Sequence, residues 1–177
     1  MRYSIDTEFI EMPPRRLEGT LIHGSIQLIS IGIVSQDGRK LHEVSSDFYP
    51  EDANPWVREH VLSILPPPDV MPRRRIEDIR ARILDFVGTD KHPRFWAYYA
   101  DYDWCSFAWI FGAMIQLPKG FPMYCLDLKQ AMHHLALPRD YLPKDPDLVH
   151  DALSDAQWVH DSLAILEPVA AQKGIRL

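Results

Sequence analysis

The chain has 177 residues, of which 46% are hydrophobic and 25% are charged, and its formal net charge is −6. This composition excludes a disordered or fibrous protein, and the length allows one well-buried core, so we expect a single domain over residues 1–177. A protein that binds nucleic acid broadly is normally basic, so the negative charge argues against such a binder. It leaves room for an enzyme that acts on a strand end, because bound divalent cations would reverse the local field.

The first part of the chain predicts an antiparallel three-stranded meander. Residues 2–9 alternate as a strand does, and residues 25–34 form a continuous β-branched run that is typical of a central strand. A turn at 36–38 leads into a third strand at 40–48. Residues 11–24 contain prolines and glycines and are expected to form a long hairpin loop.

The rest of the chain predicts alternating helices and strands. Asn54-Pro55 is a helix-start signal for a helix at 56–65, and apolar residues at helical spacing predict a second helix at 74–87. The remaining expected elements are a strand at 94–100, a helix at 102–115, a short strand at 124–126, a helix at 128–135, a loop at 138–146 and a last helix at 151–172. A strand meander followed by alternating elements predicts a mixed α/β layer architecture.

Two cysteines, Cys105 and Cys125, have apolar neighbours and belong to no paired-cysteine spacing, so we expect both to be small buried side chains. The first residues show no charged-then-apolar leader, because strand-like alternation begins by Tyr3. No apolar run is long enough to cross a bilayer. These features predict a cytoplasmic protein that does not contact membranes.

Asp6 and Glu8 lie two residues apart on the first predicted strand, so their carboxylates point to one face, while Ile5 and Thr7 point to the other. Two neighbouring carboxylates raise each other's pKa unless a cation lies between them. Mg²⁺ and Mn²⁺ prefer such oxygen ligands. Asp-x-Glu is also the pattern of two solvated residues on an edge strand, so the pair needs support from elsewhere in the chain.

Two later segments carry suitable partners. Asp103 follows a predicted strand by a short turn and begins an apolar helix. His150 and Asp155 form a His-x4-Asp pair at the start of the last predicted helix, where both side chains can point at one site. This spacing is expected about once by chance in such a chain. His42 and Asp47 share it, but an odd spacing places them on opposite faces of a predicted strand, so they cannot converge.

Three segments together resemble the motifs of the DEDDh 3′–5′ exonucleases, which have ribonuclease-H-like folds. The segments are Ile5-Asp6-Thr7-Glu8-Phe9, Ala100-Asp101-Tyr102-Asp103 and His150-Asp151-Ala152-Leu153-Ser154-Asp155-Ala156. Their order and their strand-then-helix contexts agree with the family, and the resemblance covers nearly the whole chain. The compact length, the opening Asp-Thr-Glu-Phe-Ile-Glu and the segment Trp-Val-Arg-Glu-His-Val are most similar to the small RNase AS-type exoribonucleases, which favour adenylate-rich RNA ends.

The resemblance implies a ribonuclease-H-like mixed sheet, with an antiparallel three-stranded meander and added parallel strands, flanked by helices. It also implies two Mg²⁺ or Mn²⁺ ions per active site, with Asp6 as the bridging ligand and with Glu8, Asp103 and Asp155 as further ligands. His150 would take the proton from the attacking water.

Two other aspartates bear on the motifs. Many relatives carry asparagine near the second motif, whereas here Asp101 accompanies Asp103, so Asp101 stays open as the alternative carboxylate. Asp127 resembles a family aspartate that is more often structural.

Substrate contacts are expected at Thr7 and Phe9 in the first motif, where relatives hold the terminal nucleotide, and at Trp56. Aromatic faces stack unpaired bases well, although both aromatic residues could equally belong to the core. Arg15, Arg16 and the run at 73–75 are candidate phosphate contacts, although the pattern of the run favours a solvated surface. The resemblance favours single-stranded RNA 3′ ends as substrate, with DNA left open, and a homodimer.

Two rival functions remain at this stage. Histidine-aspartate pairs such as His150-Asp151 and His160-Asp161, together with His133-His134, suggest an HD-type metal phosphohydrolase. That site needs an all-helical frame, which the predicted meander contradicts. A catalytically silent module that binds RNA ends is the other rival, but it should have lost a ligand, and this sequence has lost none.

Overall fold

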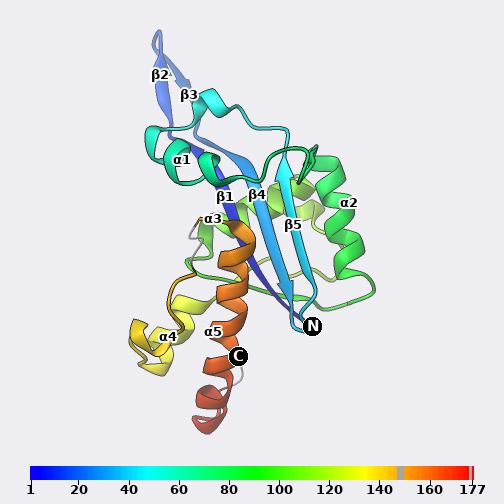
Figure 1. The fold of residues 1–177 in the computed structure, drawn as a ribbon, viewed down its shortest axis with the longest axis vertical. Coiled ribbons are helices and arrows are strands. Elements are labelled where there is room, and N and C mark those ends of the chain that lie inside the picture. The colour runs from blue at the N-terminus through cyan, green and yellow to red at the C-terminus, as the bar shows by residue number, and fades with distance from the viewer. Residues whose placement is uncertain (147–149, 176) are drawn as a thin grey trace.

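The computed structural model describes residues 1–146, 150–175 and 177. A mixed sheet runs through the middle of these residues, with six strands in the order β6-β5-β4-β1-β7-β8 (Figure 1). Its strands are β1 Arg2–Met12, β4 Ser25–Ser35, β5 Lys40–Ser45, β6 Arg73–Arg74, β7 Arg94–Ala97 and β8 Leu126–Asp127. Strands β1, β4 and β5 form the expected antiparallel meander. Strands β7, β8 and β6 add in parallel to β1, β7 and β5, respectively. The predicted ribonuclease-H-like mixed sheet is confirmed.

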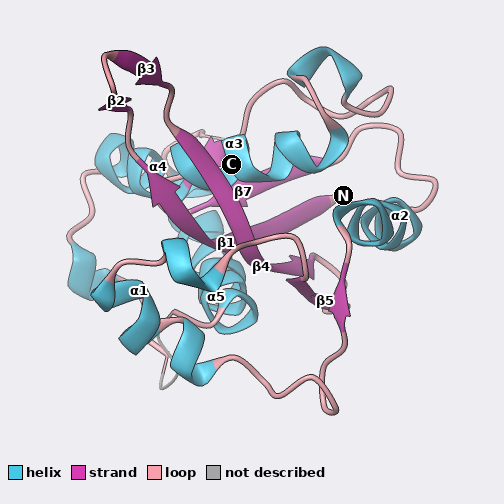
Figure 2. Cartoon of the chain, turned by 90° about the horizontal axis from the view of Figure 1, so that it is seen from above, coloured by secondary structure: helices cyan, strands magenta, loops and turns pink. Residues whose placement is uncertain are grey.

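Helices cover both faces of this sheet (Figure 2). They are α1 Pro55–His60, α2 Ile76–Val87, α3 Asp101–Phe111, α4 Leu128–Leu135 and α5 Ala152–Gln172. Helices α2 and α3 pack on one face, where Ile79, Ile83 and Phe107 meet the strand residues Tyr3 and Ile5 in one buried cluster. Helices α4 and α5 form a second cluster on the other side. The two layers arise because residues of β1 alternate between the two faces.

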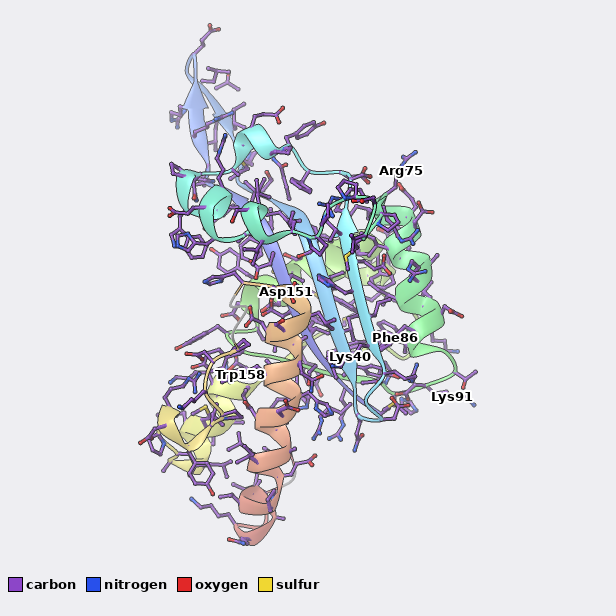
Figure 3. All side chains as sticks on the ribbon, in the orientation of Figure 1. Lys40, Arg75, Phe86, Lys91, Asp151 and Trp158 are labelled. Atoms are coloured by element: carbon purple, nitrogen blue, oxygen red, sulfur yellow. The ribbon has the colours of Figure 1, made fainter. Side chains whose placement is uncertain are left out.

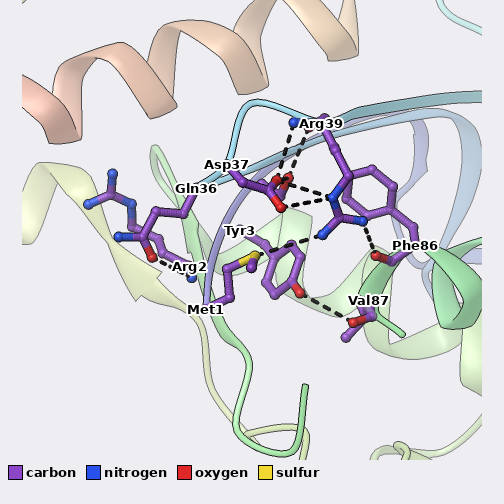
Figure 4. Close-up of polar contacts among 9 residues, drawn as sticks. Met1, Arg2, Tyr3, Gln36, Asp37, Arg39, Phe86 and Val87 are labelled. Carbon is purple, nitrogen blue, oxygen red and sulfur yellow. Dashed lines mark hydrogen bonds and ion pairs between the residues drawn. The ribbon is translucent and has the colours of Figure 1, made fainter. Parts of the chain in front are cut away.

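The start of β1 ties both layers together. The guanidinium of Arg2, which is 4% exposed, pairs with Glu167 on α5. The hydroxyl of Tyr3 donates to the carbonyl of Val87 at the end of α2 (Figure 4). Arg39 follows the turn between β4 and β5. Its guanidinium lies 4.8 Å from the centre of the Phe86 ring and donates to the Phe86 carbonyl at 2.7 Å.

The predicted long loop at 11–24 is wrong in part. Strand β1 extends to Met12, and a two-stranded hairpin follows, with β2 at Arg15–Leu17 and β3 at Thr20–Ile22. Figure 1 shows this hairpin projecting beyond α1. Glu18 and Gly19 adopt positive φ angles at its tip, and this turn chemistry closes the hairpin.

Several predicted elements end earlier than expected. The third strand ends at Ser45, because Asp47 leaves the sheet and accepts a hydrogen bond from the backbone N–H of Ile76 near the start of α2. The helix expected at 56–65 ends at His60 and continues only as a 3₁₀ turn at Leu62–Ile64. The prolines at 66–68 cannot continue it.

The strand and helix around the second motif are also shorter than predicted. The strand ends at Ala97, and Tyr99 has a φ of +59°, which breaks the extended backbone. Helix α3 begins at Asp101 and ends at Phe111, because Gly112 has a φ of +108°. The short strand lies at Leu126–Asp127, slightly later than expected, and the expected loop at 138–146 contains a 3₁₀ turn at Arg139–Tyr141.

The expectation for the cysteines is half right. Cys125 is partly buried, and burial raises the pKa of its thiol well above the usual value. Cys105 is exposed, because it lies on the outer face of α3 while Trp104 and Phe107 point to the core. Apolar neighbours in the sequence are a poor guide on a helix, where side chains one residue apart point in different directions. Among the described helices, none is long and apolar enough to span a membrane.

Candidate active site

A cavity of about 720 Å³ opens where β1, α3 and α5 meet. The five residues predicted to carry the chemistry all line it: Asp6, Glu8, Asp103, His150 and Asp155. Strand β1 provides the first two from one face. Ile5 is 0% exposed in the core on the other face, as alternation predicts, whereas Thr7, which is 5% exposed, also borders the cavity next to Asp103.

Asp103 enters the cavity from the first turn of α3. Its Oδ1 accepts hydrogen bonds from the backbone N–H and the hydroxyl of Thr7, at 2.8 and 2.7 Å. The strand therefore fixes the orientation of a carboxylate that belongs to a helix. Asp101 is exposed at the start of the same helix and is not among the described residues of the cavity wall. This geometry favours Asp103 over Asp101 for the second motif.

Asp127 has a structural position. Its Oδ1 accepts from the backbone N–H of Gln130 and caps α4, and its Oδ2 accepts from the backbone N–H of Ala100, each at 2.7 Å. The side chain thus holds the turn before α3 in place. This is the structural role that the sequence favoured.

His150 and Asp155 approach from the start of α5. Asp151 is the N-cap of this helix, and its Oδ1 accepts from the backbone N–H and the hydroxyl of Ser154. His150 has a φ of +68°, and its backbone N–H donates to Asp155 Oδ2 at 2.9 Å. The ligand atoms of Glu8, His150 and Asp155 lie within 4.8 Å of one another. The first and third motifs thus converge.

His42 lies near this arrangement, although the sequence analysis gave it no role in the site. His42 Nε2 is buried and lies 3.8 Å from Oδ2 of Asp151, the cap of α5. Asp47 lies after β5 and accepts a hydrogen bond from the backbone N–H of Ile76, the first residue of α2. The prediction that His42 and Asp47 do not share a site agrees with these positions.

The electrostatics of the cavity are those of crowded, buried carboxylates. Burial, and then the charges of Asp103, Glu8 and Asp155, raise the pKa of Asp6 well above its usual value. The same causes, burial first and the Asp155 and Asp103 charges next, raise the pKa of Glu8 to about 8. Like charges cannot all stay ionised here without a counter-charge.

The other two carboxyl groups are perturbed less. Burial raises the pKa of Asp103 to about 6 against the lowering effect of the hydrogen bonds from Thr7. Burial likewise raises the pKa of Asp155 to about 6, and the N–H of His150 opposes it. Burial and the nearby His60 lower the pKa of His150 itself. A cluster of oxygen donors with unfavourable mutual repulsion fits a site for hard divalent cations.

Aromatic side chains form part of the cavity wall. Trp56 is 49% exposed, stacks on His60 with ring centres 4.8 Å apart, and meets the His150 ring edge-on at 4.7 Å. Phe9 stacks on Tyr102 at 5.4 Å with nearly parallel planes. Trp56 is therefore not a core residue.

Thr7 lies in the cavity wall, but its hydroxyl already donates a hydrogen bond to Asp103. The arginines proposed as phosphate contacts lie elsewhere. Arg15 and Arg16 are on the exposed hairpin, Arg74 pairs with the buried Glu43 at 2.8 Å, and Arg75 pairs with Glu77.

The sequence analysis missed part of the wall, namely Tyr98, Tyr99, Tyr102, Arg139 and Trp158. Tyr102 stands inside the second motif and could have been found from it. Trp158 lies three residues after Asp155, a spacing that puts both on one helix face. Arg139 gave no signal, because it lies in a proline-rich stretch away from every motif.

The fold and the acidic cavity define a ribonuclease-H-like protein. No family model matches the chain. Among curated proteins, it is 41% identical over 160 residues to 3′-5′ exoribonuclease Rv2179c of Mycobacterium tuberculosis strain H37Rv and to 3′-5′ exoribonuclease MT2234.1 of strain CDC 1551. The matched region covers 89% of this chain and 88% of each relative. The chain therefore belongs to this exoribonuclease family.

Proposed function

We propose that this protein is a divalent-metal-dependent 3′–5′ exoribonuclease of the DEDDh type, and that it releases nucleoside 5′-monophosphates from single-stranded RNA. One observation carries the proposal: three segments far apart in the sequence bring four carboxylates and one histidine into a single cavity. The identity to proteins named 3′-5′ exoribonuclease supports the reaction and the choice of RNA.

Asp6, Glu8, Asp103 and Asp155 would hold two Mg²⁺ or Mn²⁺ ions. Burial, and then the neighbouring carboxylates, raise the pKa values of Glu8, Asp103 and Asp155, and this supports the assignment, because bound cations would offset both effects. When bound, two such metal ions supply stabilisation of the negative charge that develops on the attacking and leaving oxygens of a phosphodiester.

His150 would accept the proton of the attacking water. Its lowered pKa keeps the imidazole neutral near pH 7, and a neutral imidazole is the form that a general base requires. The edge contact with Trp56 and the positive φ at His150 fix the ring in the cavity. Glu8 and Asp155 lie close enough to stabilise the imidazolium that forms.

The aromatic walls fit an unpaired terminal nucleotide. Trp56 and Tyr102 are 49% and 46% exposed, Phe9 stacks on Tyr102, and all three rings line the cavity. Stacking on such faces is worth about 1–3 kcal/mol per base. A duplex end would first have to be unstacked and unpaired, which costs a few kcal/mol. We therefore propose single strands as the substrate.

Digestion of end-labelled RNA and DNA homopolymers with Mg²⁺ or Mn²⁺ tests the function. We expect stepwise shortening from the 3′ end, mononucleotide products, faster loss of RNA than of DNA, and fastest loss of adenylate ends. Cleavage of circular RNA would instead indicate an endonuclease. Binding of RNA ends without metal-dependent cleavage would favour the silent module. The HD-type rival is disfavoured, because its site needs an all-helical frame and this chain is built on a mixed sheet.

The family resemblance also favours a homodimer. Sedimentation equilibrium of the purified protein tests this, and a monomer at micromolar concentration would contradict it.

A further inference from the structure

The cavity wall contains a cation, Arg139, to which the proposed function gives no role. Six carboxylates belong to its described wall: Asp6, Glu8, Glu11, Asp103, Asp145 and Asp155. Among the same described wall residues, Arg139 is the one Arg or Lys. A substrate with a polyanionic backbone meets repulsion over most of this surface, so a fixed cation inside it bears directly on binding.

The guanidinium of Arg139 is held in a defined position. It lies over the ring of Trp158, with its central carbon 4.5 Å from the ring centre. Its Nη1 and the indole Nε1 of Trp158 both donate to the carbonyl of Pro143, each at 3.2 Å. Its Nη2 pairs with Asp145. Stacking and a shared acceptor thus join the arginine and the tryptophan into one unit.

This unit lies next to the proposed metal ligands. Trp158 follows Asp155 by three residues on α5, which puts the two side chains on one face about one turn apart. Asp145 is close enough for its charge to contribute to the raised pKa of Asp155. Figure 3 shows Trp158 on the side of α5 that faces α4, below Asp151 at the start of the helix. The Trp158 ring that carries the guanidinium is therefore about one helical turn along α5 from Asp155, and Arg139 lines the same cavity.

The bonds of Arg139 leave it able to bind a ligand. A guanidinium has five N–H donors in a planar fork, and the described contacts use only part of them. The Arg139 side chain is 37% exposed, and its partner Asp145 is 69% exposed, so a ligand can reach the fork and compete with that carboxylate. Planar bidentate donors match the oxygens of a phosphate.

We propose that Arg139 binds the phosphate next to the scissile one, on its 5′ side. The inference rests on the proposed 3′–5′ exonuclease function. A terminal nucleotide with a free 3′ hydroxyl has no phosphate beyond it, so the only neighbour of the scissile phosphate lies toward the 5′ end. Arg139 then favours substrates with a phosphate on the 5′ side of the scissile one, such as a dinucleotide with a 5′ phosphate. A dinucleoside monophosphate, which has only the scissile phosphate, lacks this contact. Arg139 is a positioning residue that acts in binding and not on the reacting atoms.

Steady-state kinetics on three RNA substrates tests the proposal. The substrates are a dinucleoside monophosphate, the same molecule with a 5′ phosphate, and a hexanucleotide. A hydrogen-bonded ionic contact is worth about a 10- to 100-fold change in affinity. Arg139→Ala should raise KM by that factor for the second and third substrates and by less than about twofold for the first, with kcat little changed. The slope of log affinity against log salt for the hexanucleotide should become shallower by about 0.7, as for one lost phosphate contact on a single strand.

Control variants separate binding from folding. Lys91→Ala removes one cation from an exposed loop outside the cavity and should leave all three substrates unaffected. Asp145→Asn removes the competing carboxylate and should lower KM for the 5′-phosphorylated dinucleotide, which keeps the test available even if Arg139→Ala folds poorly. Arg139→Lys should recover only part of the loss, because the ammonium lacks the fork.

Two results would overturn the proposal. An equal rise in KM on all three substrates would mean that Arg139 contacts the scissile phosphate or only supports the fold. Unchanged KM values would mean that Arg139 does not contact the substrate. Wild-type protein that cleaves none of the three substrates would instead contradict the proposed function.

Discussion

The main chain of Gly32 in β4 lies against the carbonyl of Ala152 at the start of α5, and a Cβ on residue 32 would fall 2.1 Å from that oxygen. Gly32 also pairs across the sheet with Asp6. The missing side chain therefore lets the start of α5 approach β1 closely enough for Asp155 to join Asp6 and Glu8. A single small residue outside the three sequence motifs thus permits the close approach of two elements that carry them.

Gly32→Ala should destabilise the fold and strongly reduce activity. Overpacking of this kind costs about 1–3 kcal/mol, and a displacement of α5 by about 1 Å can lower the rate by about 100-fold. Thermal unfolding and single-turnover cleavage measure the two effects. Gly38→Ala is the control, at a turn glycine with open space around it and a φ of +86°; backbone strain should lower its stability, but it should keep full activity because it does not touch α5. An active Gly32→Ala protein of normal stability would contradict the role given to this contact.

Asp6→Asn should abolish cleavage while the protein stays folded. The substitution removes one charge from a group whose pKa is raised by burial and by the surrounding carboxylates. Without metal, relief of this repulsion should raise the melting temperature near pH 8. The measurements are Mg²⁺-dependent turnover and thermal unfolding in chelator. Substantial Mg²⁺-dependent turnover would sink the proposed two-ion site.

Asp103→Ala should be far more damaging than Asp101→Ala. Asp103 is 6% exposed and accepts two hydrogen bonds from Thr7, whereas Asp101 is exposed outside the cavity wall. Loss of an outer partner of a metal site typically costs about 10- to 100-fold, and loss of a ligand should exceed this. Asp101→Ala serves as the matched control and should change kcat/KM by less than about threefold. If the order of the two defects were reversed, Asp101 would be the ligand.

His150→Ala should lower turnover by about 10²- to 10⁴-fold, the usual contribution of a general base. RNA binding and metal binding should change little, because the residue is proposed to move a proton and not to hold an ion. The ligand atoms of His150, Glu8 and Asp155 lie within 4.8 Å of one another, so a ligand role is the alternative. Calorimetric titration with Mn²⁺ decides between them, since affinity lost in step with activity would make His150 a ligand.

The metal-free protein should lose stability as the pH rises from about 5 to 8. In the unfolded chain the carboxyl groups titrate near 4, whereas in the folded protein the pKa is about 8 for Glu8 and about 6 for Asp103 and Asp155. The folded state therefore binds more protons in this window, and the free energy of unfolding falls with rising pH. Thermal unfolding in chelator should show this decline, and added Mn²⁺ should raise the melting temperature more at pH 8 than at pH 5.5. A flat profile would argue that burial and the neighbouring carboxylates do not raise these pKa values in the folded protein.

The sequence alone determined the local chemistry of this protein. Period-two alternation put Asp6 and Glu8 on one face of a strand, and the apolar patterns of the two helices placed Asp103 and Asp155 near their starts, because these properties depend on residues a few positions apart. The motifs combined these side chains into one site, and the structure brings all of them to one cavity. Their metal-binding and catalytic roles stay predictions for the experiments above.

Only the tertiary structure decided how the segments meet. The contact of Gly32 with Ala152, the position of His42 near Asp151, and the stacking of Arg139 on Trp158 join residues that are remote in the sequence or lie outside every periodic pattern. Sequence periodicity reports which face a side chain occupies, but it carries no information on which distant element covers that face, since this depends on close packing between whole layers.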